Sequence, residues 1–180
     1  MVYVFLADGF EEIEALSAVD ILRRANISVN TVGVSGKEVT GAHGITVKAD
    51  ITIGEVERFD IDALVLPGGM PGAVNLKNSA ELSELLLYAK GESKILAAIC
   101  AAPLVLGSLG LLKGKNATCY PGFEDELIGA KITDAKVCVD GDTVTASGPA
   151  AAADFAFALV EKLKDKNTAK QIRKGMLLEV

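Results

Sequence analysis

The sequence has few cysteines and histidines. Its 180 residues include three cysteines, Cys100, Cys119 and Cys138, and a single histidine, His43. The cysteines are odd in number, lie far apart and form no C-x-x-C pair, which argues against a disulfide framework and against a zinc site. We therefore expect reduced thiols, no bound metal and no other cofactor.

Long apolar runs and an excess of basic residues are also missing. No uninterrupted apolar run reaches the roughly 20 residues that a membrane span needs, and acidic residues follow the apolar start at once, which is unlike a secretory signal. Lys and Arg number 18 against 24 Asp and Glu, a formal net charge of −6. This balance repels phosphate backbones and anionic lipids. We expect a cytoplasmic protein that binds neither nucleic acid nor membrane.

Short β-branched runs alternate with helical stretches, and no repeat or linker divides the chain, so we expect residues 1–180 to form a single domain. The expected strands are 2–6, 27–34, 61–66, 93–99, 117–120, 136–140 and 143–147; the expected helices are 10–25, 79–90, 102–110 and 149–163; a hairpin is expected within 37–51, and a charged surface helix or tail at 164–174. This alternation predicts an α/β, doubly wound, flavodoxin-like sandwich with helices on both faces of a mainly parallel sheet. Ligands of such sheets bind beyond the carboxyl ends of the strands.

The strongest local signal for chemistry is a buried strand that runs directly into Cys100. Two small residues, Ala101 and Ala102, follow the cysteine, and Pro103 then suits the start of a helix. The pattern is typical of a nucleophile elbow, whose side chain projects into the ligand crevice. A helix N-terminus at this place favours the thiolate over the thiol. The alternative is an inert core thiol, because free cysteine is among the most buried residue types.

Glycines follow another expected strand directly, at Gly68 and Gly69. Their backbone N–H groups, together with the amide of Ala101, could receive a developing oxyanion. The alternative is an ordinary tight turn between a strand and a helix.

Three carboxylates, Glu11, Glu12 and Glu14, crowd the start of the first helix. Such a cluster usually lies on a solvated face, where it complements the helix dipole. A carboxyl held beside a thiol would instead have a raised pKa and could move a proton; the spacing does not select one of the three. We expect His43 to be solvated in its loop, and Cys119 and Cys138 to pack in the core or at an interface.

Several segments resemble the ThiJ/PfpI superfamily and, within it, the branch of the Parkinson-disease-associated deglycase and chaperone. In chain order they are 5–14 (FLADGFEEIE), 20–25 (DILRRA), 66–69 (LPGG), 97–103 (AAICAAP), 147–149 (SGP) and 154–156 (DFA). The resemblance covers essentially the whole chain, and the Ala-Ala-Ile-Cys-Ala segment is its most specific element.

The resemblance implies roles for particular residues. It implies that Cys100 is an oxidation-sensitive nucleophile and that Glu14 is a protonated carboxyl that hydrogen-bonds the sulfur and lowers its pKa. Gly69 and Ala101 match the residues whose amides form the oxyanion pocket. Further candidates near the site are Gly68, Tyr120, His43, Gly148 and Pro149.

Two positions depart from the family pattern. Ala101 stands where the protease-like branch has a histidine, which argues against peptidase activity. Tyr120 stands where the deglycase branch has a histidine before a proline. A phenol with a pKa of about 10 can donate a hydrogen bond but is a poor base near neutral pH, so Tyr120 puts fast glyoxalase turnover in question.

The resemblance implies a cofactor-independent enzyme of the glyoxalase III or deglycase type, a lyase or hydrolase. Its substrates would be small reactive aldehydes such as methylglyoxal, or glycated thiols and amines, and its assembly a homodimer. One alternative is a redox-sensing stress or chaperone protein that uses a sulfinic acid at Cys100. Another is a structural dimer with vestigial chemistry.

Overall fold

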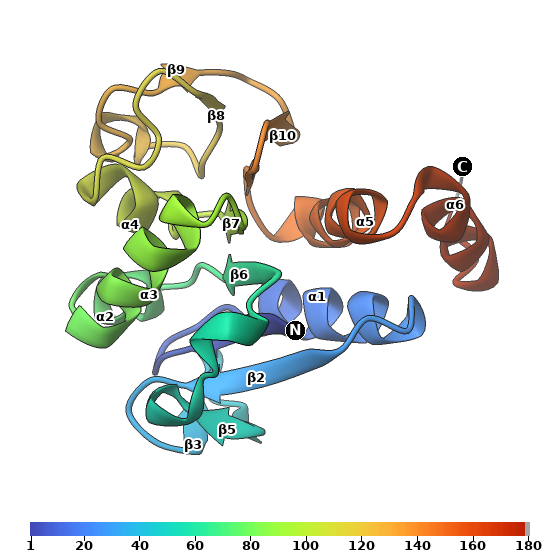
Figure 1. The fold of residues 1–180 in the computed structure, drawn as a ribbon, viewed down its shortest axis with the longest axis horizontal. Coiled ribbons are helices and arrows are strands. Elements are labelled where there is room, and N and C mark those ends of the chain that lie inside the picture. The colour runs from blue at the N-terminus through green and yellow to red at the C-terminus, as the bar shows by residue number, and fades with distance from the viewer. Residues whose placement is uncertain (179–180) are drawn as a thin grey trace.

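A seven-stranded sheet forms the centre of the computed structural model, which describes residues 1–178 (Figure 1). From edge to edge the strands are β10 (Val137–Asp140), β11 (Thr143–Ala146), β7 (Ile95–Ile99), β6 (Ala63–Leu66), β1 (Val2–Leu6), β2 (Val29–Gly33) and β5 (Ile51–Thr52). All neighbouring strands are parallel except β10 and β11. The predicted mainly parallel α/β sheet is confirmed.

Helices cover both faces of the sheet, as predicted (Figure 1). One face carries α1 (Glu12–Arg24) and α5 (Ala152–Leu163), with α6 (Lys166–Gly175) packed on α5; the other carries α2 (Gly72–Lys77), α3 (Ala80–Gly91) and α4 (Pro103–Ser108). In β1, Val2 and Val4 pack on the α1 side, whereas Tyr3 packs on the α3 side. Because successive side chains of a strand point to opposite faces, a strand buried on both faces reads as one continuous apolar run.

The direction of the chain reverses beside β1. From β1 the chain moves outward to β2 and β5, and it then returns to β6 on the other side of β1. Crevices in such sheets form at the carboxyl ends of the strands where the order reverses. The segments that follow β1, β6 and β7 meet there, and they carry Glu14, Gly68 and Cys100.

Smaller elements complete the fold. They are the antiparallel hairpin of β3 (Glu38–Thr40) and β4 (Thr46–Lys48), the pair of β8 (Asn116–Ala117) and β9 (Lys131–Ile132), and the 3-10 turns Ile53–Glu55, Arg58–Asp60, Glu124–Glu126 and Pro149–Ala151. The hairpin expected within 37–51 is confirmed.

Two local predictions need correction, and one helix has no counterpart among the expected elements. The helix α2 was not predicted, because the prolines and glycines of 67–72 favour a turn. The strand expected at 117–120 ends at Ala117, and Tyr120 N–H donates to Cys100 O at 2.8 Å instead of joining a strand ladder. Pro149 opens a 3-10 turn, closed by Ala151 N–H donating to Gly148 O at 2.8 Å, and α5 begins only at Ala152.

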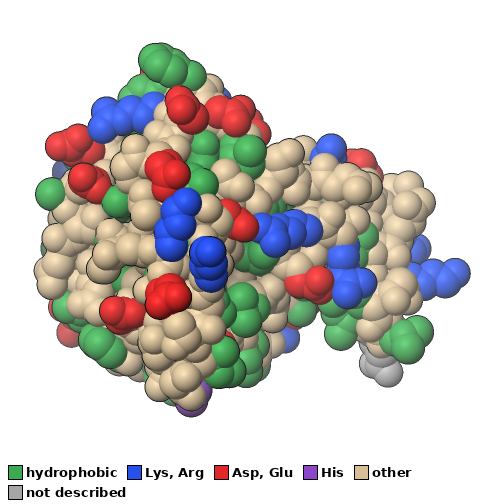
Figure 2. Space-filling model, turned by 90° about the horizontal axis from the view of Figure 1, so that it is seen from below, with side chains coloured by type: hydrophobic (Ala, Val, Ile, Leu, Met, Phe, Trp, Pro, Cys, Tyr) green, Lys and Arg blue, Asp and Glu red, His purple; other side chains and the backbone are tan. Residues whose placement is uncertain are grey.

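Charges of both signs are interspersed on the surface. On the face in Figure 2, Lys and Arg side chains lie among Asp and Glu side chains and form no continuous basic field. Among the helices within residues 1–178, none has the length and apolar character that crossing a bilayer requires.

Candidate functional site

Cys100 lies at the sharp turn between β7 and α4. Its φ of +64° is in the left-handed region, which residues other than glycine seldom adopt and which is found preferentially at functional sites. Two backbone hydrogen bonds hold this turn: Cys100 N–H donates to Ala146 O at 2.8 Å, and Cys100 O accepts from Tyr120 N–H at 2.8 Å. The side chain is largely buried, with an exposed fraction of 9%.

Glu14 is the carboxylate that the fold places beside this thiol. It lies in the first turn of α1 and is completely buried. Its Oε2 accepts a hydrogen bond from Gly68 N–H at 2.7 Å, whereas its Oε1 has no hydrogen-bond partner within the described residues. The Cys100 side chain is within hydrogen-bonding reach of the carboxyl.

Glycines allow the strands to bring these groups together. A β-carbon on Gly68 would lie 2.6 Å from Cys100 Cβ and 2.8 Å from Glu14 Oε2. Gly69 has a φ of +88°, and a β-carbon there would lie 2.4 Å from Glu11 N. The backbone amides of Gly69 and Ala101 lower the pKa of the Cys100 thiol, so they are placed to stabilise negative charge on the sulfur or on an attached oxygen.

Burial dominates the proton affinities of the pair. It raises the pKa of the Cys100 thiol to about 12, with a further contribution from the charge of Glu14, and the amides of Gly69 and Ala101 oppose this only in part. Burial also raises the pKa of Glu14 to about 7, against the hydrogen bond from Gly68. The lowered thiol pKa expected from the sequence is not found, because desolvation outweighs the amide donors. Burial therefore favours the protonated form of both groups.

Glu11 and Glu12 do not lie on a solvated face, contrary to the expectation for such a cluster. Both are buried, because the β3–β4 hairpin covers them. Glu12 Oε1 accepts hydrogen bonds from the backbone N–H groups of His43 at 2.9 Å and Ile45 at 3.4 Å. A β-carbon on Gly41 would lie 2.2 Å from the same oxygen. Glu12 thus fixes the hairpin turn to the start of α1, a role that the spacing of the three carboxylates does not indicate.

His43 pairs with these carboxylates and, within residues 1–178, makes no hydrogen bond to Cys100. Its Nδ1 lies 2.9 Å from Glu12 Oε2 and 3.6 Å from Glu11 Oε2. The hydrogen bond to Glu12 raises the pKa of His43. Ligand atoms of Glu11, Glu12 and His43 lie within 4.8 Å of one another, the one potential metal-binding group in the described part of the chain, but hydrogen bonds already occupy both oxygens of Glu12.

Two of the other candidates, Tyr120 and Gly148, lie beside the turn at Cys100, whose carbonyl accepts the Tyr120 N–H. The half-exposed ring of Tyr120 packs against Gly148, where a β-carbon would lie 3.1 Å from Tyr120 Cδ2. Gly148 precedes Pro149, the first residue of the 3-10 turn before α5.

All three cysteines are free thiols. Cys138 is buried in β10; Cys119 is buried beyond the end of β8, where burial raises its pKa to about 11.

Comparisons with known proteins agree with this geometry. The model of the DJ-1/PfpI family matches residues 1–162. Protein dj-1beta of Drosophila melanogaster is 35% identical over 178 residues, which are 97% of this chain and 95% of the relative. A deglycase of Pyrococcus horikoshii is 37% identical over 147 residues, 80% of this chain and 87% of the relative.

The solved structure of oxidized DJ-1 from Toxoplasma gondii superposes with a TM-score of 0.95 at 41% identity and covers 99% of this chain and 98% of that one. The resemblance found in the sequence and the flavodoxin-like fold are confirmed. The chain belongs to the DJ-1/PfpI family.

Proposed function

We propose that the protein is a cysteine-dependent, cofactor-independent enzyme that converts small reactive carbonyl compounds, with Cys100 as nucleophile and Glu14 as proton carrier. One observation carries the proposal: a fully buried carboxyl has one oxygen on a backbone N–H and the other without a partner within residues 1–178, beside a strained cysteine. The proposal is supported by family membership and by relatives named as deglycases in two Pyrococcus species.

The reacting form arises by a proton transfer within the pair. The proton moves from the Cys100 sulfur to Glu14, so the site carries one negative charge before and after the transfer. When the negative charge is on the sulfur, the backbone amides of Gly69 and Ala101 stabilise it. When the charge is on Glu14, the hydrogen bond from Gly68 N–H stabilises it. Because the net charge is unchanged, the transfer avoids the cost of ionising a second buried group.

Methylglyoxal illustrates the chemistry. The thiolate forms a C–S bond with the aldehyde carbon, and the carbonyl oxygen takes the proton from Glu14, giving a hemithioacetal. Glu14 then removes the hydrogen of that carbon as a proton and returns a proton to the neighbouring carbon through an enediol. The result is a thioester of lactate. Water breaks the C–S bond and releases lactate and the thiol. The aldehyde carbon is oxidised and the ketone carbon reduced, so no external oxidant is required.

Lactate formation from methylglyoxal tests the proposal. Cys100→Ser should abolish turnover, and Glu14→Gln should reduce kcat/KM roughly 100-fold or more, the usual contribution of a general acid–base group. Cys119→Ser is the matched control, since it removes another buried thiol and should leave the rate near that of the wild type. Turnover no faster than with an equal concentration of free cysteine, or turnover retained in Cys100→Ser, would overturn the proposal.

A redox-responsive protein is the second candidate function. It is favoured by the same thiol, which has a buried carboxyl beside it to hydrogen-bond a sulfinic acid, and by the solved relative described as oxidized. Its test is mass spectrometry after graded peroxide treatment. Selective formation of the sulfinic acid at Cys100 and not at Cys119 or Cys138, without turnover of methylglyoxal, would favour this reading over the enzyme.

We also infer that the protein forms a homodimer. Four exposed apolar side chains gather around the start of α1 and are called the α1 patch: Ile13, Leu16, Ile45 and Met70. The hydrogen bond between Ile45 N–H and Glu12 fixes the hairpin part of the α1 patch beside the helix. A second copy of the chain, presenting the same apolar residues, would cover this surface.

A further inference from the structure

Glu11, Glu12 and His43 lie together beside the start of α1 and are called the carboxylate–histidine cluster. Glu11 is the N-cap residue of α1 and Glu12 is its first helical residue, whereas His43 comes from the turn of the β3–β4 hairpin. Within residues 1–178, none of the three side chains hydrogen-bonds Cys100 or Glu14. The reaction proposed above therefore leaves the cluster without a chemical role.

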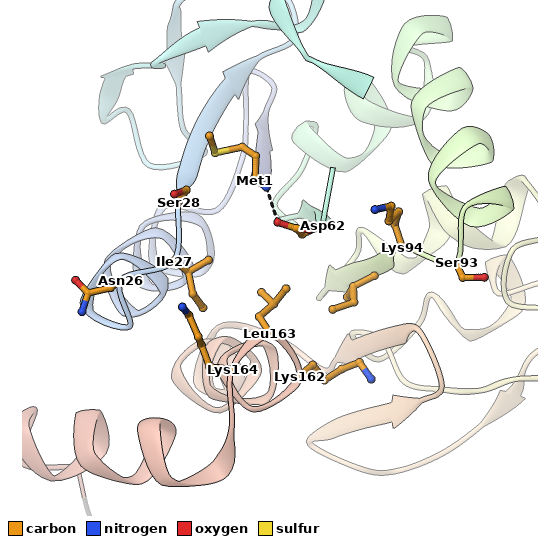
Figure 3. A pocket seen from close by; sticks show the side chains of 11 residues that line it. Met1, Asn26, Ile27, Ser28, Asp62, Ser93, Lys94, Lys162, Leu163 and Lys164 are labelled. Carbon is orange, nitrogen blue, oxygen red and sulfur yellow. Dashed lines mark hydrogen bonds and ion pairs between the residues drawn. The ribbon is translucent and has the colours of Figure 1, made fainter. Parts of the chain in front are cut away.

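The two carboxylates of the cluster are buried without a lysine or arginine partner. Glu11 and Glu12 have exposed fractions of 9% and 5%, and within residues 1–178 their only ion pairs are with His43. In contrast, the carboxylate of Asp62 is paired with the amino group of Met1 (Figure 3). Buried charges in proteins are paired or coordinate metal ions. With a neutral His43, the cluster carries two negative charges and no counter-charge.

Glu11 is the member of the cluster that has no hydrogen bond. Its carboxylate accepts none within residues 1–178, not even the N-cap bond that its position at the start of α1 would allow. Its Oε2 faces His43 Nδ1 across 3.6 Å, which is too long for a direct hydrogen bond. A helix-capping role therefore does not explain why this carboxylate is buried beside the other two side chains.

The three side chains already have the spacing of metal ligands. His43 Nδ1 lies 2.9 Å from Glu12 Oε2 and 3.6 Å from Glu11 Oε2, and ligand atoms of all three residues lie within 4.8 Å of one another. Ligands that lie about 2.0 to 2.2 Å from a tetrahedral zinc ion are roughly 3.3 Å apart. The hydrogen bonds of Glu12 leave room for an ion, because each carboxylate oxygen has two lone pairs; only its contact with Nδ1 would be replaced.

We propose that the carboxylate–histidine cluster binds one divalent transition-metal ion such as Zn²⁺, with Glu11 Oε2, Glu12 Oε2 and His43 Nδ1 as ligands. The ion takes the place of the proton that Nδ1 shares with Glu12, and its two positive charges offset the two carboxylates. An imidazole nitrogen suits zinc, copper or nickel better than magnesium or calcium. Three protein ligands leave a fourth position for water, as in open zinc sites.

This proposal departs from the sequence expectation of no bound metal. That expectation came from the absence of cysteine and histidine motifs with zinc-ligand spacing. Glu12 and His43 are 31 positions apart, and the hairpin brings them together only in the folded chain. Local spacing therefore does not reveal this ligand set.

Calorimetric titration of the native protein with Zn²⁺ tests the proposal. We expect one ion per chain, with an affinity that is roughly tenfold or more weaker in Glu11→Gln and in His43→Gln, since each variant lacks a ligand. The side chain of His43 is 68% exposed, so its replacement should not disturb folding. Mg²⁺ should bind at least tenfold more weakly than Zn²⁺, because it disfavours the imidazole ligand.

NMR spectroscopy identifies the histidine ligand directly. His43 is the only histidine in the sequence, so its ring signals need no further assignment. One equivalent of Zn²⁺ should shift these signals, and further additions should not.

Two control variants separate the cluster from other metal-binding groups. Glu38→Gln removes an exposed carboxylate from the same hairpin and should leave the Zn²⁺ affinity unchanged. Cys100→Ser should also bind Zn²⁺ as the wild type does, since the thiol is not a proposed ligand. Absence of stoichiometric binding, unshifted ring signals of His43, equal binding of Mg²⁺, or loss of binding in either control would each overturn the proposal.

Discussion

Gly68 lies between the two proposed reacting side chains and has no room for a β-carbon. We expect Gly68→Ala to push Cys100 away from Glu14, because the new methyl group would lie 2.6 Å from one and 2.8 Å from the other. A displacement of about 1 Å can cost roughly 100-fold in rate, so kcat/KM for methylglyoxal should fall by about that factor while the circular dichroism spectrum is retained.

Gly54→Ala provides the matched control for this substitution. A β-carbon at Gly54 meets nothing within 4 Å, so this variant should keep the wild-type rate. A Gly68→Ala protein that is as active as Gly54→Ala would show that close contact between the thiol and the carboxyl is dispensable.

The buried carboxyl of Glu14 should make stability depend on pH. Its pKa in the folded protein, about 7, exceeds its ordinary value of 4.5, so the folded chain holds the proton more tightly than the unfolded chain does. The stabilising contribution is complete below about pH 4.5 and is lost as the pH rises to about 7, to an extent of about 3 kcal/mol at most.

Urea denaturation of wild type and Glu14→Gln between about pH 4 and pH 8 measures this effect. The free energy of unfolding of the wild type, relative to the variant, should fall across that range, because glutamine does not titrate. A difference that stays constant with pH would mean that Glu14 titrates at the same pH in the folded and unfolded chains.

At the scale of elements, the β3–β4 hairpin depends on the buried carboxylate of Glu12. In Glu12→Gln the charge that holds His43 and two backbone N–H groups is removed, and charge-assisted hydrogen bonds are stronger than neutral ones. Hydrogen exchange at the amides of His43 and Ile45 should accelerate roughly tenfold, as a local opening of the turn. Mass spectrometry of the exchanged peptides measures it.

Glu38→Gln is the control for this effect, since Glu38 is an exposed carboxylate on the same hairpin. It should leave exchange at the turn unchanged. Equal acceleration in both variants, or none in Glu12→Gln, would show that the turn is held by its backbone alone.

Elements with strong local signals could be predicted from the sequence. The apolar runs of β1 and β6 were recognised because strands buried on both faces need no alternation. The helix expected at 79–90 is α3, which begins at Ala80, and Ser79 Oγ caps it by accepting a hydrogen bond from Leu82 N–H at 3.2 Å. In contrast, α2 depends on tertiary packing: it starts at Gly72, where a β-carbon would lie 2.6 Å from Phe10 N.

The candidate site was only partly predictable, because most of its contacts also depend on tertiary packing. The turn at Cys100 has a local pattern, whereas the choice of Glu14 came from the family resemblance, because spacing alone does not distinguish it from Glu11 and Glu12. The partners of Glu12 lie about thirty positions along the chain, in the hairpin turn. The pKa values depend on burial, which is a property of the packed molecule rather than of a segment.

At the scale of the whole molecule, the proposed dimer can be broken through the α1 patch. The double variant Ile13→Ser/Ile45→Ser adds no charge near Glu14 but removes apolar area from the proposed interface. We expect its mass in light scattering after size exclusion to correspond to one chain, whereas the wild type should correspond to two. Leu87→Ser, an exposed apolar position on α3, should remain dimeric. A monomeric wild type, or an unaffected double variant, would contradict the inference.

The parallel strands give the sheet two chemically different rims. The proposed reactive thiol lies at one rim and the ion pair of Met1 and Asp62 at the other (Figure 3), and a five-residue strand such as β1 separates the two by about 16 Å. A molecule seated at one rim is too far away to touch a molecule seated at the other. Substitutions at the amino-terminal rim should therefore leave the reacting atoms in position, because the buried strands between the two rims are held by the sheet and the core.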